Sequence, residues 1–209
     1  MSLYVEEKTA SSVPPLAEDT YPAVCYALVD LGEQFSAVYE KYTKKIAIGW
    51  ELPGETITID GETVPRTFFN TYTASLSTKS LLRKDLTSWR GKEFTVEELK
   101  GFNLRNIVGV PCMIQIVHRK SADGSRTYAN LASVTKIPKG FPAPKGKLEP
   151  MIYDIEEDDP AVVDTLPQWM QDKIKESRSF QFHLEQLKNE GKPKFEELDD
   201  DEDGGTLPF

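Results

Sequence analysis

The stretch TITIDGETV, residues 56–64, places the pair Asp60-Gly61 between residues that favour β-strands. An Asp-Gly pair suits the centre of a two-residue hairpin turn, because both central positions adopt a positive φ angle that these residues tolerate. The stretch therefore predicts a β-hairpin. Before it, residues 44–52 alternate apolar side chains with small or charged ones, which is the period of a half-buried strand. After it, residues 66–73 continue the hairpin as a further strand.

Two more regions complete the predicted sheet. Residues 22–35 are rich in apolar and β-prone side chains, and Gly32 within them indicates a bulge or bend in a first strand. Residues 112–120 and 127–137 flank an Asp-Gly pair at 123–124, so they predict a second hairpin.

A helical insertion separates the two predicted hairpins. Leu82, Leu86 and Trp89 have the spacing of one helix face, and Gly91 follows as a stop signal. The motif TVEE at 95–98 is a capping box, which marks the start of a second, short helix.

The predicted elements run in the order of three strands, a helical insertion and a closing two-strand hairpin. This order favours a mainly β architecture of the OB-fold type, a five-stranded Greek-key barrel that binds oligonucleotides on its open face. SH3-like barrels and other small all-β folds give a similar order and remain alternatives.

The predicted barrel is one of four parts of the chain. Residues 1–20 form an irregular arm, 21–150 the OB-fold domain, 151–195 a linker with short helices, and 196–209 an acidic tail. Within the linker region, residues 165–168 resemble a capped helix start. The apolar side chains expected to cover the barrel or a partner are Trp169, Met170, Ile174, Phe180 and Leu184.

Charge is segregated along the chain. The whole sequence has 25 Lys and Arg against 34 Asp and Glu, a net charge of −9. Residues 66–147 carry fifteen bases against five acids, a net charge of +10. The tail 196–209 carries seven acids, and 154–164 carries six with no base among them. A basic middle and an acidic end in one chain indicate binding to a polyanion, with a tail that competes for the same surface.

Composition and motifs argue against several other classes of protein. No apolar run approaches the ~18 residues of a membrane span, and the N-terminus lacks the basic and apolar regions of a signal peptide. We therefore expect a soluble, cytoplasmic protein with no membrane partner. Cys25 and Cys112 lie in apolar, strand-like runs and are interpreted as buried thiols. His118 and His183 are the only histidines, without a His/Cys cluster for zinc, so we expect no metal, no cofactor and no catalysis.

The C-terminal acidic run ends in Leu207-Pro208-Phe209, and the ring of Phe209 beside a terminal carboxylate suits docking by the end of the chain. This ending resembles the tip of bacterial single-stranded DNA-binding proteins, in which acids precede Ile-Pro-Phe. Residues 21–139 resemble the OB-fold single-stranded DNA-binding proteins of bacteriophages. The resemblance implies that the tail recruits replication and repair enzymes and folds back onto the DNA groove when DNA is absent. It assigns partner binding to Asp199, Asp200, Asp201, Glu202, Asp203, Leu207, Pro208 and Phe209.

The ending also departs from the bacterial pattern. Leu207 stands in place of isoleucine, residues 204–206 separate the acids from the tip, and a Gly/Gln-rich linker is missing. Assembly into a homo-oligomer therefore stays open, and a phage origin would place the protein in the host cytoplasm.

A groove for single-stranded nucleic acid needs cations for phosphates and flat rings for bases. Both kinds of residue occur in the predicted barrel. The candidate cations are Lys44, Lys45, Arg66, Arg119, Lys120, Arg126, Lys136 and Lys139, and the candidate rings are Trp50, Phe68, Tyr72 and Tyr128. Lys145 and Lys147 follow, together with Phe141.

A core role competes with stacking for several of these rings. Trp50 shares its strand face with the apolar residues of 44–52, so core is at least as good an interpretation as groove. Phe68 and Phe69 are adjacent and must point to opposite faces, so one of them belongs to the core; Tyr72 lies on the Phe68 face.

The sequence thus predicts a non-catalytic protein that binds single-stranded DNA in phage replication, recombination or repair. Two alternatives remain. One is a strand-annealing or recombination-mediator protein, and the other is an adaptor whose basic face binds an acidic protein.

Overall fold

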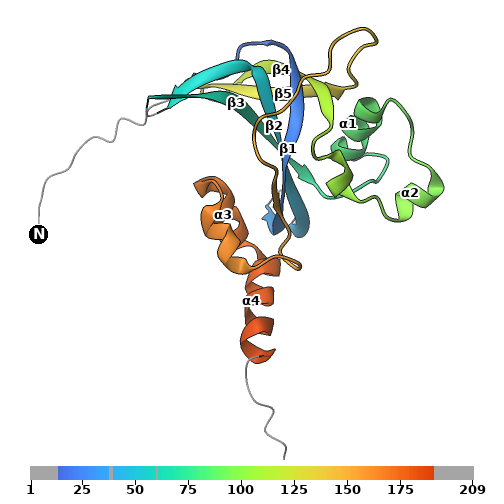
Figure 1. The fold of residues 1–209 in the computed structure, drawn as a ribbon. Coiled ribbons are helices and arrows are strands. Elements are labelled where there is room, and N and C mark those ends of the chain that lie inside the picture. The colour runs from blue at the N-terminus through green and yellow to red at the C-terminus, as the bar shows by residue number, and fades with distance from the viewer. Residues whose placement is uncertain (1–13, 38–39, 60, 191–209) are drawn as a thin grey trace, which may run out of the picture.

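The computed structural model describes residues 14–37, 40–59 and 61–190 (Figure 1). Its strands are β1 (Asp19–Ser36), β2 (Lys41–Ile59), β3 (Glu62–Thr73), β4 (Pro111–Lys120), β5 (Thr127–Thr135) and β6 (Met151–Tyr153). Its helices are α1 (Leu81–Arg90), α2 (Val96–Lys100), α3 (Gln168–Glu176) and α4 (Arg178–Glu190), with two 3-10 helices, η1 (Leu104–Ile107) and η2 (Pro160–Thr165).

Five strands form one antiparallel sheet in the order β3-β2-β1-β4-β5. The first part of β1 pairs with β4 and the rest pairs with β2, and Val24 is paired on both sides. Register shifts follow Cys25 and Asp30, the second of them at Gly32, whose φ is 72°. Such bulges bend a strand and increase its twist, and the sheet curls into a half-barrel (Figure 1). The mainly β, OB-fold-like architecture and the bend at Gly32 are confirmed.

Both predicted hairpins are present. At the turn between β2 and β3, Gly61 has a φ of 86°; Asp60 lies outside the described residues. At the turn between β4 and β5, Gly124 has a φ of 72°. Glycine is needed at both turns because a positive φ is strained for other side chains.

The strand predicted at 44–52 proved longer than expected. β2 runs without a break through the first arm of the hairpin, and its register against β3 shifts between Leu52 and Thr56. Pro53 lies at this shift, where a residue without an N–H group does least harm to the ladder.

The inner side of the half-barrel is filled by its own side chains and by α1. Leu82, Leu86 and Trp89 are the buried residues of α1, as the helical spacing predicted. The Trp89 ring lies 6.2 Å from the Trp50 ring, and its Nε1 donates a hydrogen bond of 3.0 Å to the carbonyl of Pro111. The helix therefore fastens β2 to the start of β4.

The helix-end signals of the insertion are confirmed. Gly91 ends α1 in the left-handed conformation, with a φ of 66°, and its N–H bonds the carbonyl of Thr87. At the start of α2, the Thr95 hydroxyl accepts from the Glu98 N–H, and the Glu98 carboxylate accepts from the Thr95 N–H.

Cys25 and Cys112 are free thiols within the core, as predicted. Burial raises the pKa of Cys25 to about 12, and it also raises the pKa of Cys112. Both side chains therefore act as small apolar residues of the barrel interior.

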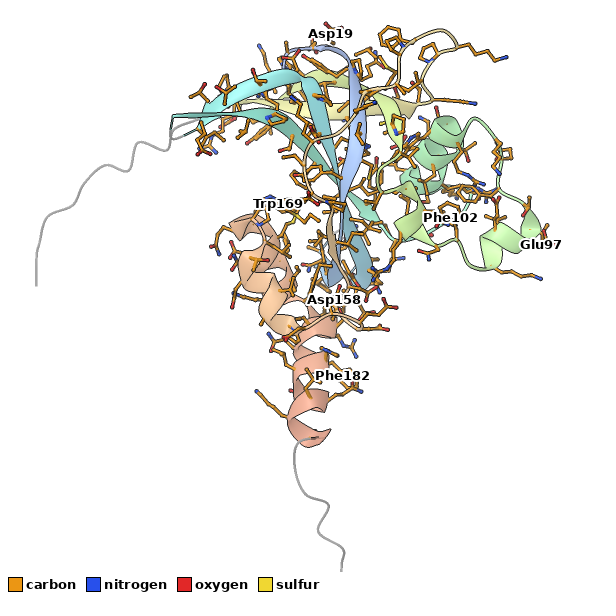
Figure 2. The ribbon with its side chains drawn as sticks, in the orientation of Figure 1. Asp19, Glu97, Phe102, Asp158, Trp169 and Phe182 are labelled. Atoms are coloured by element: carbon orange, nitrogen blue, oxygen red, sulfur yellow. The ribbon has the colours of Figure 1, made fainter. Side chains whose placement is uncertain are left out.

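The outer side of β1 and β2 is covered by the segment that follows the barrel. β6 pairs in parallel with β1, an element the sequence did not predict. Met170, Ile174 and Phe180 are buried against the outer side of the sheet, and Leu184 is partly buried there. Figure 2 shows Trp169 on α3 facing the sheet, and its ring lies 5.8 Å from that of Phe69. These side chains cover the barrel, which was one of the two expected roles.

The start of α3 differs from the prediction at 165–168. Pro167 occupies the N-cap position without a side-chain bond, and the Thr165 hydroxyl donates instead to the carbonyl of Val162. Thr165 ends η2, so its hydroxyl serves the preceding helix.

We predict that Met170→Ala lowers the free energy of unfolding by about 2–5 kcal/mol, because it leaves a cavity between α3 and the sheet. Urea denaturation of the full chain measures this loss. Lys173→Ala, an exposed position of the same helix, is the control and should change stability by less than about 0.5 kcal/mol. Equal effects of the two changes would show that α3 does not pack on the barrel.

Candidate nucleic-acid interface

The structure separates the predicted nucleic-acid residues into two groups. One group lies on β2 and β3, where most side chains are occupied by the protein itself. The other lies on β4, β5 and the segment that follows β5.

Trp50 and Tyr72 belong to the core, which corrects the prediction that they stack on bases. Trp50 is 0% exposed and Tyr72 is 3% exposed. The Tyr72 hydroxyl donates a 2.8 Å hydrogen bond to Asp85 Oδ2, and burial together with the Asp85 charge raises the pKa of Tyr72. Phe68 is partly buried against the same cluster. Trp50 pairs with Phe68 and Tyr72 pairs with the buried Ile46, so all three rings lie on the filled side of the sheet.

Arg66 is bonded to the N-terminal segment. Its Nη2 donates a 2.5 Å hydrogen bond to the carbonyl of Pro14. On β4, His118 Nε2 lies 2.7 Å from the carbonyl oxygen of Leu16, and the His118 N–H donates to the Glu18 carboxylate. Leu16 itself is only 4% exposed and packs in the inner core. Residues 14–18 thus connect β3 with β4 through these hydrogen bonds. The sequence predicted an irregular arm for this segment.

Lys44 and Lys45 are also engaged on their own sheet. Lys44 Nζ lies 3.0 Å from the buried carboxylate of Asp30, and Lys45 Nζ donates a 2.8 Å hydrogen bond to Thr73 Oγ1. Burial acts to lower the pKa of Lys44, but the bond and charge of Asp30 outweigh it, so the net shift is upward. Lys44 lines a cavity of about 420 Å³ that is also lined by the ion pair of Arg105 and Glu157. This cavity lies between β1, β2, η1 and β6 rather than on an open sheet face.

The outer side of β4 and β5 is different. Register pairs Arg119 with Tyr128 and Gln115 with Ser133. These side chains share one face, because β4 buries its alternate residues, Cys112, Ile114 and Ile116, in the inner core. We call this surface the β4–β5 face; its other members are Val117, Asn130, Met113 and Thr135.

The β4–β5 face joins a cation to an exposed ring. Tyr128 is 50% exposed and lies directly opposite Arg119, which is exposed as well. Lys120 and Arg126 are exposed at the adjoining turn. The structure therefore brings these four predicted residues together at one end of the hairpin.

The charge of this region is almost of one sign. Residues 111–148 carry seven Lys and Arg and one acid, Asp123, a net charge of +6. Asp123 accepts hydrogen bonds from Ser121 and Ser125 within the turn, and these bonds lower its pKa to about 2. Its carboxylate therefore stabilises the turn, and the remaining side chains present cations and neutral polar groups.

The chain from 136 to 150 extends the basic region beyond β5. Lys136 and Lys139 are exposed, and Lys145, Lys147 and Phe141 are exposed further along. We call this segment the strap. The predicted residues Asp199 to Asp203 and Leu207 to Phe209 lie outside the described residues.

Sequence reasoning missed two features of this surface. The first is the polar pair of Gln115 and Ser133 on the β4–β5 face. The Ser133 hydroxyl donates a 3.3 Å hydrogen bond to Gln115 Oε1. The alternating pattern of 112–120 contained this information for Gln115, because Gln115 and Arg119 are four positions apart and strand residues an even number of positions apart share a face. The second is the bridge formed by residues 14–18, for which no local sequence signal exists.

Comparison of the chain with models of protein families gave no match, and neither did comparison with curated protein sequences. In residues 14–37, 40–59 and 61–190, no helix has the length and apolar character needed to span a membrane. The same part of the chain contains no group of three or more His, Cys, Asp or Glu side chains placed to hold a metal ion.

Proposed function

We propose that this protein binds single-stranded DNA without sequence preference, and that the strand lies on the β4–β5 face. The observation that carries the proposal is the exposed pair of Arg119 and Tyr128 within a region of net charge +6. Cations bind phosphates of any sequence, and an exposed ring stacks on any unpaired base.

The shape and chemistry of the face favour a single strand. Stacking requires bases that are not already paired, so Tyr128 selects an open strand over a duplex. From Pro111 to Arg119 the face extends roughly 27 Å along β4, since each residue adds about 3.4 Å. This length suits a strand of several nucleotides, within the ~4–16 that OB-folds cover.

The C-terminal acids provide the second part of the proposal. The resemblance of the tail to that of bacterial single-stranded DNA-binding proteins supports a role in recruiting replication, recombination or repair proteins through Phe209. The seven acids of the tail are opposite in sign to the +6 charge of the 111–148 region and similar to it in size, so the tail competes with DNA for the same cations.

The proposal predicts tight binding of the full chain to a labelled oligo-dT strand and weak binding to the matching duplex. Fluorescence anisotropy at several salt concentrations measures both, and the affinity should fall steeply with salt because phosphate contacts release counterions. An RNA strand in the same titration tests the preference for DNA. Absence of binding at low salt would contradict the proposal and favour an adaptor that uses the basic face for an acidic protein. Faster pairing of complementary strands would instead indicate an annealing protein.

Deletion of residues 196–209 should raise the affinity for oligo-dT at low salt, and the gain should shrink as salt is added, because screening weakens the competition. Anisotropy titrations of the full and shortened chains make the comparison. Unchanged affinity at low salt would show that the tail does not compete with DNA.

Tyr128→Ala should weaken binding to oligo-dT by about 1–3 kcal/mol, the value of stacking one base on a ring. Tyr42→Ala is a matched control, since Tyr42 is 49% exposed but lies on β2, away from the β4–β5 face. Both variants are compared with the unmodified chain by anisotropy. A larger loss for Tyr42→Ala would move the binding surface to β2.

A further inference from the structure

The carboxylate of Glu51 is buried at the outer side of the sheet and bonded to the strap. Glu51 is 0% exposed. The Lys147 N–H lies 2.9 and 2.8 Å from its two oxygens, and the Leu148 N–H donates to Oε2 at 2.9 Å. The residues joined are 96 and 97 positions apart in sequence. A carboxylate removed from water requires such donors, because an unpaired buried charge is very costly.

The strap approaches the sheet closely at this point, and Gly146 makes the approach possible. A Cβ atom on Gly146 would lie 3.0 Å from Glu51 Oε2 and 3.3 Å from a methyl group of Val24. Any other residue would therefore crowd both the carboxylate and β1. The close approach and the two backbone donors together fix where the strap crosses the sheet.

That crossing point lies at one end of the β4–β5 face. Val24 pairs with Glu51 on β2 and with Pro111 on β4, so Gly146 sits over the junction of the three strands. Pro111 begins β4, on the same outer side as Gln115 and Arg119. Lys145 and Lys147, which flank Gly146, are thus held beside the end of the face opposite to Tyr128.

We infer that the strap is a second strand-binding element, and that Glu51 is the positioning residue that holds it. Lys145 and Lys147 bind phosphates at one end of the β4–β5 face, while Arg119 binds them at the other. Among the described residues, the donors bonded to Glu51 are backbone N–H groups, and the side chains of Lys145 and Lys147 are exposed, so both ammonium groups are available to phosphates. This inference rests on the proposed function, which it deepens by defining the second end of the DNA path.

The experiment has a binding part and a structural part. The binding part measures the salt dependence of oligo-dT affinity for Lys145→Gln/Lys147→Gln. Loss of two phosphate contacts should reduce the slope of log affinity against log salt by about 1.4, because each contact to a single strand contributes about 0.7. The control is Lys173→Gln/Lys188→Gln, which removes the same charge from exposed positions of α3 and α4 and should leave the slope unchanged.

The structural part tests the bond between Glu51 and the strap without DNA. Glu51→Gln replaces one acceptor oxygen by a donor group, and Gly146→Ala displaces the strap without altering the sheet. Both should accelerate tryptic cleavage after Lys145 and Lys147 and hydrogen exchange of the Lys147 and Leu148 amides, and both should lower the salt slope as the lysine variant does. Glu62→Gln, which removes an exposed acid from β3, is the control. Gly146→Ala keeps the test valid if Glu51→Gln fails to fold.

Each outcome decides the inference. An unchanged salt slope for Lys145→Gln/Lys147→Gln, while the unmodified chain binds DNA, would overturn the binding role of the strap. Unchanged proteolysis and exchange in Glu51→Gln and Gly146→Ala would overturn the positioning role of Glu51. Failure of the unmodified chain to bind DNA would overturn the proposed function and the binding role together, and the proteolysis result would still decide the Glu51 contact.

Discussion

The structure depends on β1, a single strand that is buried on both of its faces. Residues 23–32 are buried without interruption, because the barrel interior covers one face and α3, α4 and the strap cover the other. Such a strand must be apolar throughout, and Asp30 is the charged residue within this run. Its carboxylate is accommodated by the N–H of Gly32 and the ammonium group of Lys44. Because β1 pairs with β2, β4 and β6, its bends set the curl of the whole sheet.

Local signals were sufficient for much of this fold. The turn signals of the two hairpins, the capping box at Thr95 and the helical stripe of Leu82, Leu86 and Trp89 each act within a few residues. Both hairpins, the capping box and the buried helix face are confirmed. Features that arise from distant contacts were missed. β6 is three residues long and carries no strand signal of its own, and the bond between Glu51 and the strap joins two segments whose sequences do not indicate each other.

The candidate site was predictable in part for the same reason. Alternation shows which residues share a strand face, but it does not show which face becomes covered. Trp50 and Tyr128 both lie in alternating strands, yet one is enclosed by α1 and the inner core while the other is exposed beside Arg119. The cations predicted on β2 and β3 are bonded to other groups of the protein, and the sequence does not predict these partners. The bond from Arg66 to the carbonyl of Pro14 is an example. What remains is a basic, nearly acid-free surface on β4, β5 and the strap.

The central claim is that a single strand of DNA follows the β4–β5 face, and nuclear magnetic resonance of the full, isotope-labelled chain tests it most directly. Backbone amide shifts recorded with and without oligo-dT report which residues the strand approaches. The account predicts that the largest changes fall on Gln115 to Tyr128 and on the strap near Lys145, with little change in α3 and α4. Changes centred on Lys44, Arg66 and the β2–β3 hairpin, with the β4–β5 face unaffected, would contradict it.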